Sequence, residues 1–387
     1  MEESKRLKKL PPYLFDEILK KKKELIEKGV DVIDFGVGDP DLPTPAHIVE
    51  AMKKAVENPS YHHYPLRKGL KEFRKAISDY YRKNHGVDID PEREICVLIG
   101  AKEGIAHFPF AYVNEGDIVL VPEPAYPVYH RSTILAGGEP YFLPLLEEND
   151  FLPQFEKIPS EILSKAKILY LNYPNNPTTA FAKEEFLKEA ISFCKKYDII
   201  LAYDAAYSEI YFDEKPVSFL SIDGAKDIGI EFNTLSKTYN MTGWRIGWAC
   251  GNERLISSLC KIKENIDTGV FEAIQIAGIE ALSGPQDCVK EMRNIYKKRR
   301  DIFAEGIRKL GWDFRLPKGT FYVWVKGEIK DSIKMAKILL EETNIVAIPG
   351  VGFGPSGEGY LRFSLTIPED RIIEGIKRME EKWGRKK

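Results

Sequence analysis

Two basic residues, Lys237 and Arg245, carry the strongest chemical signal in the sequence. They lie in the segment TLSKTYNMTGWRIG, residues 234–247, which follows a run expected to form a buried strand. Lysine avoids protein interiors unless it is paired or used covalently. An isolated Ser-Lys pair would indicate a surface loop, but Gly243 and Gly247 in this segment allow close backbone approach. A lysine for a Schiff base and an arginine for a phosphate group together suit pyridoxal 5′-phosphate.

Three further segments would complete such a site. Residues 99–104, IGAKEG, join a strand end, a glycine and a helix start, whose amides and dipole favour a phosphate. Asp204 ends another strand and can pair with a protonated ring nitrogen, and Tyr207 can reach a ring hydroxyl. A helix or turn cap also explains Asp204, and a simple turn also explains the loop at 172–178. Ligands in open α/β sheets bind beyond the carboxyl ends of strands, where all these segments fall.

Taken together, these segments resemble the fold-type I, class I and II aminotransferases, and the resemblance covers essentially the whole chain. The family's cofactor lysine, in the pattern S-K-x-x-x-M-x-G-W-R-x-G, matches Lys237, and its phosphate arginine matches Arg245. The resemblance implies pyridoxal 5′-phosphate as the cofactor and Lys237, Asp204 and Tyr207 as the catalytic residues. The other cofactor contacts that it implies are Tyr64, Ala101, Lys102, Tyr126, Asn176, Thr234 and Ser236.

The same resemblance implies a substrate site and a second subunit. Arg362 matches the arginine that binds the substrate α-carboxylate bidentately. Tyr64 matches a tyrosine that reaches the phosphate of the other subunit, so we expect a homodimer with shared active sites. The remaining substrate contacts that it implies are Tyr13, Gly38, Lys102, Tyr126 and Asn176.

The chain departs from the family pattern at two positions. The family's Asn-Pro-Thr-Gly motif reads Asn176-Pro-Thr-Thr179 here, so a turn that depends on glycine is altered. A serine usually stands three residues before the cofactor lysine, and this position is Thr234, which keeps a hydroxyl group.

Several segments, among them PEPAYPVY and GPQDCVKEMR, resemble the LL-diaminopimelate aminotransferases within this family. The resemblance implies reversible amino transfer from LL-2,6-diaminopimelate to 2-oxoglutarate in lysine biosynthesis, which gives tetrahydrodipicolinate, glutamate and water. The residue types do not identify a pocket for the distal ammonium and carboxylate, so an aspartate- or alanine-type aminotransferase stays the alternative. A β-lyase dependent on the same cofactor is a further alternative. A non-catalytic regulator would need an N-terminal DNA-binding module, for which the first ~45 residues are too few.

Positioning these residues requires a parallel sheet with its helices. Apolar strands that alternate with helices predict an α/β fold with a mostly parallel sheet and helices on each side. The resemblance implies the seven-stranded sheet of fold type I. We expect a large cofactor-binding domain over residues 47–284, and a smaller α+β domain from residues 1–46 and 285–387. The strand candidates are residues 95–99, 118–121, 167–172, 199–203, 229–234 and 245–250. The helix candidates are residues 47–57, 68–83, 102–112, 183–197, 252–264 and 286–310.

Composition excludes several other classes of protein. The 57 basic and 59 acidic residues leave a net charge of −2, which does not favour nucleic acid or an acidic membrane surface. No run of about 18 apolar residues occurs, and the first residues lack an apolar signal core, so we expect a cytoplasmic protein. The 5 cysteines and 6 histidines are not spaced as ligands, so no metal site is expected.

The sequence also carries a glycine pattern and a compositional bias, which are weaker signals. Residues 352–357, GFGPSG, spell the dinucleotide pattern G-x-G-x-x-G, but Pro355 interrupts it and a strand follows, so we reject a dinucleotide site. Charged residues make up 30% of the chain, above the usual ~25%, and glutamine is rare. This composition leads to the hypothesis of a thermophilic source.

Overall fold

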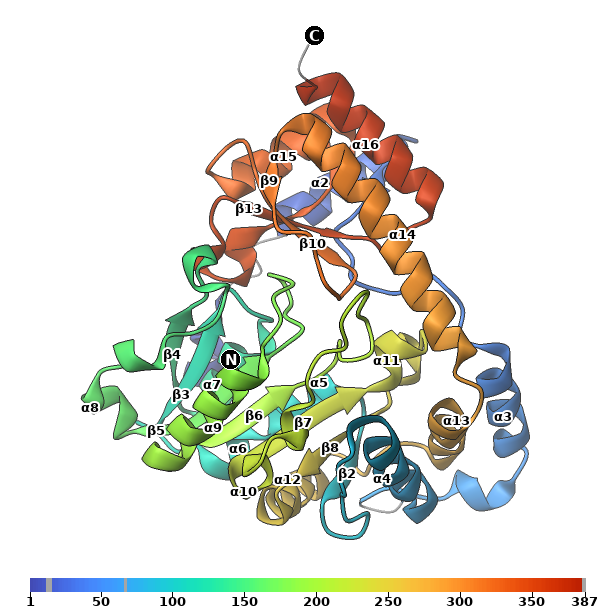
Figure 1. Ribbon diagram of the computed structural model, residues 1–387, viewed down its shortest axis with the longest axis vertical. Coiled ribbons are helices and arrows are strands. Elements are labelled where there is room, and N and C mark those ends of the chain that lie inside the picture. The colour runs from blue at the N-terminus through green and yellow to red at the C-terminus, as the bar shows by residue number, and fades with distance from the viewer. Residues whose placement is uncertain (12–15, 66–67, 385–387) are drawn as a thin grey trace.

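A seven-stranded sheet forms the centre of the larger part of the molecule (Figure 1). The computed structural model describes residues 1–11, 16–65 and 68–384. The strand order is β2-β8-β7-β6-β5-β3-β4, and β8 runs antiparallel to both of its neighbours. The other pairings among these strands are parallel, so the predicted mostly parallel α/β fold is confirmed. The strands are β2 (Ile95–Leu98), β3 (Ile118–Glu123), β4 (Glu139–Pro144), β5 (Ala166–Asn172), β6 (Ile200–Asp204), β7 (Gly229–Thr234) and β8 (Gly247–Gly251).

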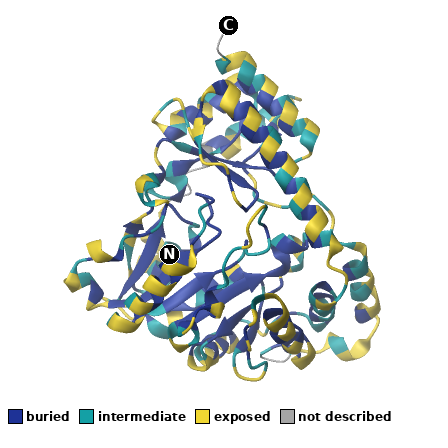
Figure 2. Ribbon diagram, in the orientation of Figure 1, coloured by how far each residue is buried: buried dark blue, intermediate teal, exposed yellow. Residues whose placement is uncertain are grey.

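Helices cover both faces of this sheet, and their exposed sides face solvent (Figure 2). Residues alternate along β5: Leu169 and Leu171 belong to the buried cluster that includes residues of α4 and α9, whereas Ile168 and Tyr170 belong to the cluster that includes residues of α5, α7 and α12. This two-residue period is the pattern of a strand buried on both faces. The helices of this part are α3 (Ala46–Val56), α4 (Lys71–His85), α5 (Ala101–His107), α6 (Pro109–Tyr112), α7 (Val128–Ala136), α8 (Ser160–Leu163), α9 (Glu184–Tyr197), α10 (Ala225–Ile228), α11 (Leu235–Thr238), α12 (Glu253–Ile266) and α13 (Glu272–Ser283).

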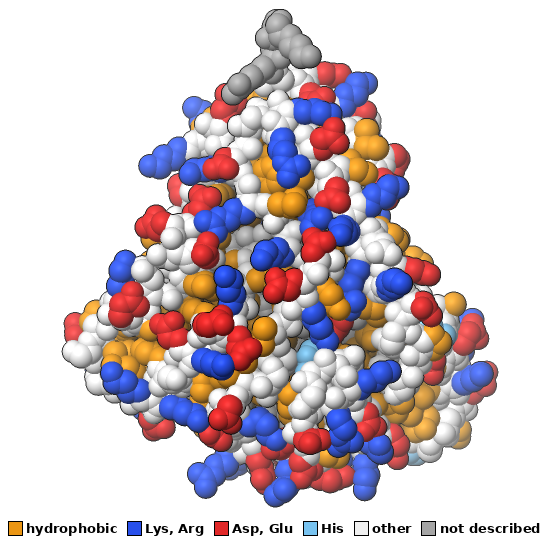
Figure 3. Space-filling model, viewed as in Figure 1, with side chains coloured by type: hydrophobic (Ala, Val, Ile, Leu, Met, Phe, Trp, Pro, Cys, Tyr) orange, Lys and Arg blue, Asp and Glu red, His pale blue; other side chains and the backbone are white. Residues whose placement is uncertain are grey.

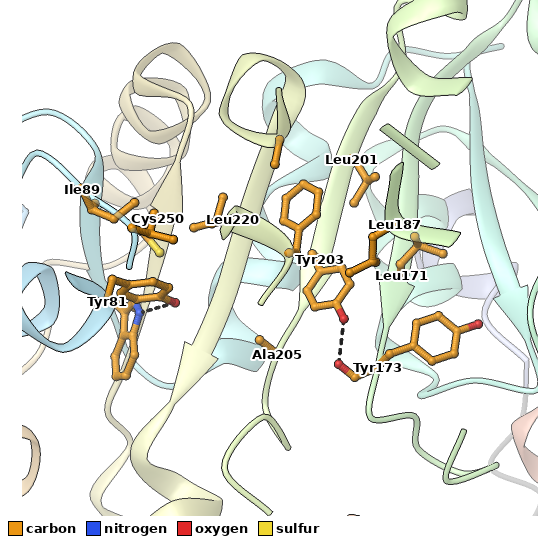
Figure 4. Packing of buried hydrophobic residues seen from close by; sticks show 14 of the residues in the cluster. Tyr81, Ile89, Leu171, Tyr173, Leu187, Leu201, Tyr203, Ala205, Leu220 and Cys250 are labelled. Atoms are coloured by element: carbon orange, nitrogen blue, oxygen red, sulfur yellow. Dashed lines mark hydrogen bonds between the residues drawn. The ribbon is translucent and has the colours of Figure 1, made fainter. Parts of the chain in front are cut away.

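Buried tyrosines tie the strand ends to the loops that follow them. Figure 4 shows Tyr203 of β6 among Leu171, Leu201 and Leu220, with its hydroxyl directed at Tyr173. The hydroxyl donates to the Tyr173 carbonyl oxygen at 2.8 Å. A buried tyrosine needs such a partner, and here the bond fixes the start of the loop after β5.

A second, four-stranded sheet lies above the first in Figure 1. Its order is β12-β13-β10-β9, all antiparallel, and β1 pairs separately with β11. The β1–β11 pair joins residues 33–34 to residues 345–346, so N-terminal and C-terminal segments pack together. The strands are β1 (Ile33–Asp34), β9 (Asp313–Phe314), β10 (Tyr322–Lys326), β11 (Ile345–Val346), β12 (Ile348–Pro349) and β13 (Tyr360–Ser364). The helices are α2 (Asp16–Glu27), α14 (Asp287–Leu310), α15 (Ser332–Thr343) and α16 (Glu369–Trp383), whereas the short helix α1 (Lys5–Lys8) packs against α7 of the larger part.

Some elements differ from the sequence prediction. Strand β4 and helix α7 were not predicted, and the helix expected over 102–112 divides into α5 and α6 at Phe108, just before Pro109. Proline lacks the amide hydrogen that would continue the first helix. Residues 350–357 form two 3₁₀ turns followed by β13, so the G-x-G-x-x-G pattern does not begin a helix.

Basic and acidic side chains are interspersed over the face seen in Figure 3. Among the described residues, none of the helices has the length and apolar character that a membrane span requires.

Candidate active site

A cavity of about 410 Å³ opens between the carboxyl ends of the central strands and the four-stranded sheet. It receives side chains from the ends of β5 and β6, from the starts of α5 and α11, and from β10 and β13. Among the described residues, it brings together every predicted site residue except Tyr64. The predicted residues that line it are Gly38, Ala101, Lys102, Tyr126, Asn176, Asp204, Tyr207, Thr234, Ser236, Lys237, Arg245 and Arg362.

Lys237 stands on the short helix α11, directly after β7. Its Nζ donates to the Gly38 carbonyl oxygen at 3.1 Å and lies 5.7 Å from the centre of the Phe321 ring. Burial lowers the pKa of Lys237 to about 8; the charge of Asp39 acts against this shift, and the charges of Arg245 and Arg362 act with it. An amine with such a pKa is partly neutral near pH 7, as a nucleophile or general base must be.

Asp204 ends β6 and is 5% exposed. Its Oδ2 accepts from the Tyr129 hydroxyl at 2.7 Å, and its Oδ1 accepts from the Ala206 amide at 3.1 Å. Burial raises the pKa of Asp204 to about 6, while these two hydrogen bonds act against the rise. No cation is hydrogen-bonded to Asp204 among the described residues, so a cationic ligand group at this point would supply the missing charge.

Arg245 and the start of α5 line another part of the cavity. Gly100 precedes α5 with φ 77°, and a Cβ there would come within 2.6 Å of Arg245 Nη2, so glycine permits this approach. Arg245 Nη1 donates to the Thr242 carbonyl oxygen at 2.8 Å. Thr234 Oγ1 lies 2.9 Å from Ser236 Oγ. Hydroxyls, helix amides and a guanidinium together make a site for a phosphate group.

Arg362, which is 7% exposed, lines a further part of the cavity. Its Nη1 donates to Asn176 Oδ1 at 2.9 Å, and its Nη2 donates to the Gly36 carbonyl oxygen at 2.8 Å. Its Nε is buried and has no hydrogen-bond partner among the described residues. The Tyr207 and Tyr322 hydroxyls lie 3.1 Å apart beside it. An arginine with an unused buried donor is suited to an anionic ligand.

Sequence analysis did not name Asn172 and Tyr322, which line the cavity, or Tyr129, which is buried behind it and donates to Asp204. Asn172 Nδ2 donates to the Asp204 carbonyl oxygen at 2.9 Å, and its Oδ1 accepts from the Asn176 amide at 2.9 Å. The position of Asn172 at a strand end could have indicated it. Nothing in the local sequence distinguishes Tyr129 or Tyr322 from an ordinary core tyrosine.

The altered turn at Thr179 keeps the backbone that glycine would adopt. Thr179 has φ 63°, in the left-handed region, and its amide donates to the Asn175 carbonyl oxygen at 3.0 Å. A β-branched residue is strained there, so the loop that carries Asn176 retains its shape at a conformational cost.

Two predicted residues lie apart from the cavity or outside the description. Tyr64 is 88% exposed and does not line the cavity of this single chain. Tyr13 lies outside the described residues. The roles of both stay predictions.

In the part of the chain that the structure describes, one group of side chains has the spacing of metal ligands: Glu103, His107 and Asp267. The Lys263 ammonium already lies 3.1 Å from Glu103 Oε2 and 2.6 Å from Asp267 Oδ1. This buried lysine supplies the positive charge that two carboxylates require, so the group is an ion-pair network.

Among the described residues, the cavity fits pyridoxal 5′-phosphate by the chemistry of its donors. A buried carboxylate without a cationic partner, an amine of lowered pKa and an arginine beside a glycine-led helix start face one space. These groups match a pyridine nitrogen, an aldehyde and a phosphate.

The comparison with known families agrees with this geometry. The model of the family "Aminotransferase class I and II" matches residues 30–379. The chain therefore belongs to the class I and II aminotransferases, and the predicted family and enzyme class are confirmed.

Individual relatives narrow the class further. The chain is 54% identical over 382 residues to the LL-diaminopimelate aminotransferase of Halothermothrix orenii, with 98% of each chain covered. It is also 54% identical to the enzyme of that name from Aquifex aeolicus, covering 97% of this chain and 98% of that one. Among solved structures, substrate-bound BacF from Bacillus subtilis aligns with a TM-score of 0.94 at 39% identity, with 98% of each chain covered. A Thermus thermophilus aspartate aminotransferase mutant aligns with a TM-score of 0.93 at 28% identity, with 98% of this chain and 99% of that chain covered.

Proposed function

We propose that this aminotransferase binds pyridoxal 5′-phosphate and transfers an amino group from LL-2,6-diaminopimelate to 2-oxoglutarate. The products are tetrahydrodipicolinate, glutamate and water, and the reversible reaction serves lysine biosynthesis. The observation that carries the cofactor assignment is the meeting of Lys237, Asp204 and Arg245 at one cavity. The substrate assignment is supported by relatives of that name that match nearly the whole chain.

The cofactor contacts follow from the donors in the cavity. When bound, pyridoxal 5′-phosphate supplies an aldehyde for amines and a ring that withdraws electrons from the substrate. Asp204 would hold the ring nitrogen protonated, and Tyr207 with Asn176 would contact the ring oxygen. Tyr126 would lie against the ring face. Arg245 and the hydroxyls of Thr234 and Ser236 would hold the phosphate, together with the amides of Ala101 and Lys102.

Lys237 would first hold the cofactor covalently and then move a proton. After the amino donor displaces Lys237, its neutral Nζ could take the proton from the substrate Cα. It could then deliver that proton to the carbon that had carried the cofactor's aldehyde oxygen. The lowered pKa, about 8, keeps a useful fraction of the amine neutral near neutral pH.

Arg362 would bind the substrate α-carboxylate. Two of its nitrogens are already fixed by Asn176 and Gly36, so the guanidinium is oriented before the substrate arrives. Preorganised charge of this kind lowers the entropy cost of binding. Gly38 and Lys102 line the same cavity and are further proposed contacts for the substrate, with Tyr13 and Tyr126.

The replacement Lys237→Ala tests this assignment. We expect turnover to fall by at least about 10³-fold, because both the covalent attachment and the proton carrier are lost. The variant should still bind the cofactor, which dialysis would then remove more readily. Lys195→Ala, which changes a surface lysine paired with Asp227, serves as the control and should keep wild-type turnover. Near-normal turnover in Lys237→Ala would exclude Lys237 from the mechanism.

The second candidate is an aspartate-type aminotransferase. The alignment with the Thermus thermophilus aspartate aminotransferase favours it, but at 28% identity against 54% for the relatives above. Both candidates use the same cofactor residues and differ only in the amino donor.

We also propose the wider setting of the enzyme. Tyr64 is exposed in the single chain and would reach the phosphate of a second copy, which makes the active form a homodimer. Residues 47–284 would form the cofactor-binding domain, and residues 1–46 with 285–387 the smaller domain. We place the enzyme in the cytoplasm of a thermophile, with small amino and oxo acids as its ligands and with no part for nucleic acid or a membrane.

A further inference from the structure

The segment GVGFGPSG, residues 350–357, has no part in the function proposed above. It forms two consecutive 3₁₀ turns in the four-stranded part of the molecule, between β12 and β13. Gly350 and Gly357 pack against each other so closely that a Cβ on Gly357 would come within 2.2 Å of the Gly350 carbonyl oxygen. The segment is therefore a tight, defined loop, and it ends three residues before the strand that carries Arg362.

This loop is bonded to the end of β3 in the seven-stranded sheet. The Ser356 amide donates to Glu123 Oε1 at 2.6 Å, and the Ser356 hydroxyl donates to Glu123 Oε2 at 2.8 Å. Glu123 is 5% exposed, so a carboxylate is removed from water and both of its oxygens are paired with one residue. Hydrogen bonds to a charged, buried acceptor are among the strong ones.

Two further contacts extend this bridge. The Ala125 amide donates to the Phe353 carbonyl oxygen at 2.9 Å, next to the cavity residue Tyr126. A Cβ on Gly354 would come within 2.3 Å of the Glu123 side chain, so glycine allows the two segments to meet. Both the backbone of Phe353 and the residues after it are thus fixed against β3.

The ring of Phe353 in turn contacts the Arg362 guanidinium. The guanidinium carbon lies 4.8 Å from the centre of the Phe353 ring and 4.2 Å from the centre of the Tyr322 ring. The two rings therefore restrict the plane of the guanidinium, and Asn176 and Gly36 bind its terminal nitrogens. Aromatic faces within 6 Å attract a guanidinium and favour a defined orientation.

We propose that Glu123 and Ser356 are positioning residues for the carboxylate of the substrate. Their bridge holds Phe353 on Arg362 and so keeps the guanidinium oriented for an α-carboxylate. This proposal rests on the role proposed above for Arg362. A bridge that only stabilised the fold would lower the melting temperature without a selective effect on carboxylate affinity.

The test measures carboxylate binding apart from turnover. Calorimetry on the holoenzyme gives the dissociation constant of glutarate, a dicarboxylate that lacks the reacting oxo group of 2-oxoglutarate. Steady-state kinetics gives KM and kcat for L-glutamate, and dialysis gives cofactor retention. The variants are Ser356→Ala, Ser356→Thr, Glu123→Gln and Arg362→Lys. Asp150→Asn is the control. Asp150 forms a separate, exposed ion pair with Arg315, at 2.5 Å, that does not involve Glu123 or Ser356.

The proposal predicts a selective loss. Ser356→Ala should weaken glutarate binding and raise KM by about tenfold, with kcat within about twofold and the cofactor retained. Ser356→Thr keeps the hydroxyl and should bind glutarate as the wild type does. The glutarate affinity of Glu123→Gln should lie between those of Ser356→Ala and Ser356→Thr. The control should match the wild type.

Three results would overturn the positioning role of Glu123 and Ser356. They also distinguish a failure of this role from a failure of the proposed function. Wild-type glutarate binding in both Ser356→Ala and Glu123→Gln, with a loss in Arg362→Lys, would refute the bridge alone. An equal loss in Asp150→Asn would show a general loosening between the two sheets. Unchanged binding in Arg362→Lys would refute the role of Arg362, and with it the proposed carboxylate site and this inference.

Discussion

Asp204 and Lys237 are charged groups that the cavity moves toward neutrality. Burial raises the pKa of the Asp204 carboxyl to about 6 and lowers the pKa of the Lys237 amine to about 8. Each group is therefore suited to a particular partner. A cation would stabilise the ionised Asp204 carboxylate, and the neutral Lys237 amine can attack a carbonyl carbon. The Tyr129 hydroxyl limits the rise at Asp204, because it stabilises the ionised form.

This balance predicts the pH dependence of Tyr129→Phe. Loss of the hydroxyl removes a hydrogen bond to the carboxylate, so the pKa of Asp204 rises further. In its proposed role Asp204 must be ionised to hold a protonated ring nitrogen, so we expect activity to be lost as the pH falls through that pKa. We expect the acidic limb of the kcat/KM profile to move to higher pH by about one unit.

Tyr170→Phe is the control for this shift. The Tyr170 ring stacks on Tyr129 at 4.9 Å, but its hydroxyl donates to the Ile105 carbonyl oxygen at 3.1 Å. The acidic limb of this variant should stay where the wild type has it. A Tyr129→Phe profile that coincides with the wild type would contradict the role assigned to Asp204.

Sequence patterns located the residues whose own surroundings are unusual. Lys237, in its glycine-flanked segment, and Asp204, at a strand end, were predicted and do line the cavity. Tyr129 and Tyr322 were not, because their importance lies in contacts with Asp204 and Arg362, far along the chain. The spacing of residues in one segment carries no information about such partners.

Among the elements, strand β7 carries another buried carboxyl group, on Glu231. Its Oε1 accepts from the Tyr81 hydroxyl of α4 at 2.5 Å, and the Trp248 Nε1 of β8 donates to that hydroxyl at 3.3 Å. Burial raises the pKa of Glu231 from 4.5 to about 7. The folded protein therefore binds a proton that the unfolded chain has released between these pH values, and stability falls as the pH rises through this window.

Glu231→Gln should remove that penalty. Glutamine keeps an oxygen for Tyr81 and carries no charge, so the variant should be more stable than the wild type at pH 8. At pH 5 the difference between the free energies of unfolding of the variant and the wild type should be smaller by about 2 kcal/mol. Urea unfolding at the two pH values measures it. Glu139→Gln, at an exposed position of β4, should show the same stability change at both. A Glu231→Gln gain that does not depend on pH would contradict this account.

The elements that sequence analysis found are those with a clear period or with apolar runs. Strand β3 is buried along its whole length, and α9 has a strong apolar face, and both were predicted. Strand β4, at the edge of the sheet, is partly exposed and contains Pro140 and Pro144, so it lacked the apolar pattern. The boundary between α5 and α6 lies at Phe108, just before Pro109. The apolar pattern continues through this proline, so a single helix was predicted.

At the scale of the whole molecule, the proposed dimer predicts complementation between two defective chains. Tyr64 lies outside the cavity of its own chain, and Lys237 lies inside it. A mixed dimer of Lys237→Ala and Tyr64→Ala chains therefore contains one site with both native residues. We expect such mixtures to exceed the activity of either parent, up to about half of one wild-type dimer. Activity no higher than the mean of the parents would place Tyr64 in its own chain's site or outside catalysis.

Ion-pair networks on the surface bear on the thermophile hypothesis. Asp31 accepts from both Arg371 and Arg378 at 2.5 Å, and Arg378 also pairs with Glu374. Networks of this kind stabilise proteins more at high temperature than isolated pairs do. We expect a melting midpoint above the range of roughly 45–65 °C that is usual for mesophile domains. Calorimetry of the holoenzyme measures it, and a midpoint inside that range would count against the hypothesis.

The identity of the amino donor can be determined by comparing values of kcat/KM. The experiment compares LL-diaminopimelate with aspartate and alanine, with 2-oxoglutarate as the acceptor in each case. We expect kcat/KM for LL-diaminopimelate to exceed the values for aspartate and alanine by several orders of magnitude. Comparable or faster turnover of aspartate would leave the cofactor residues in place and would contradict the proposed substrate.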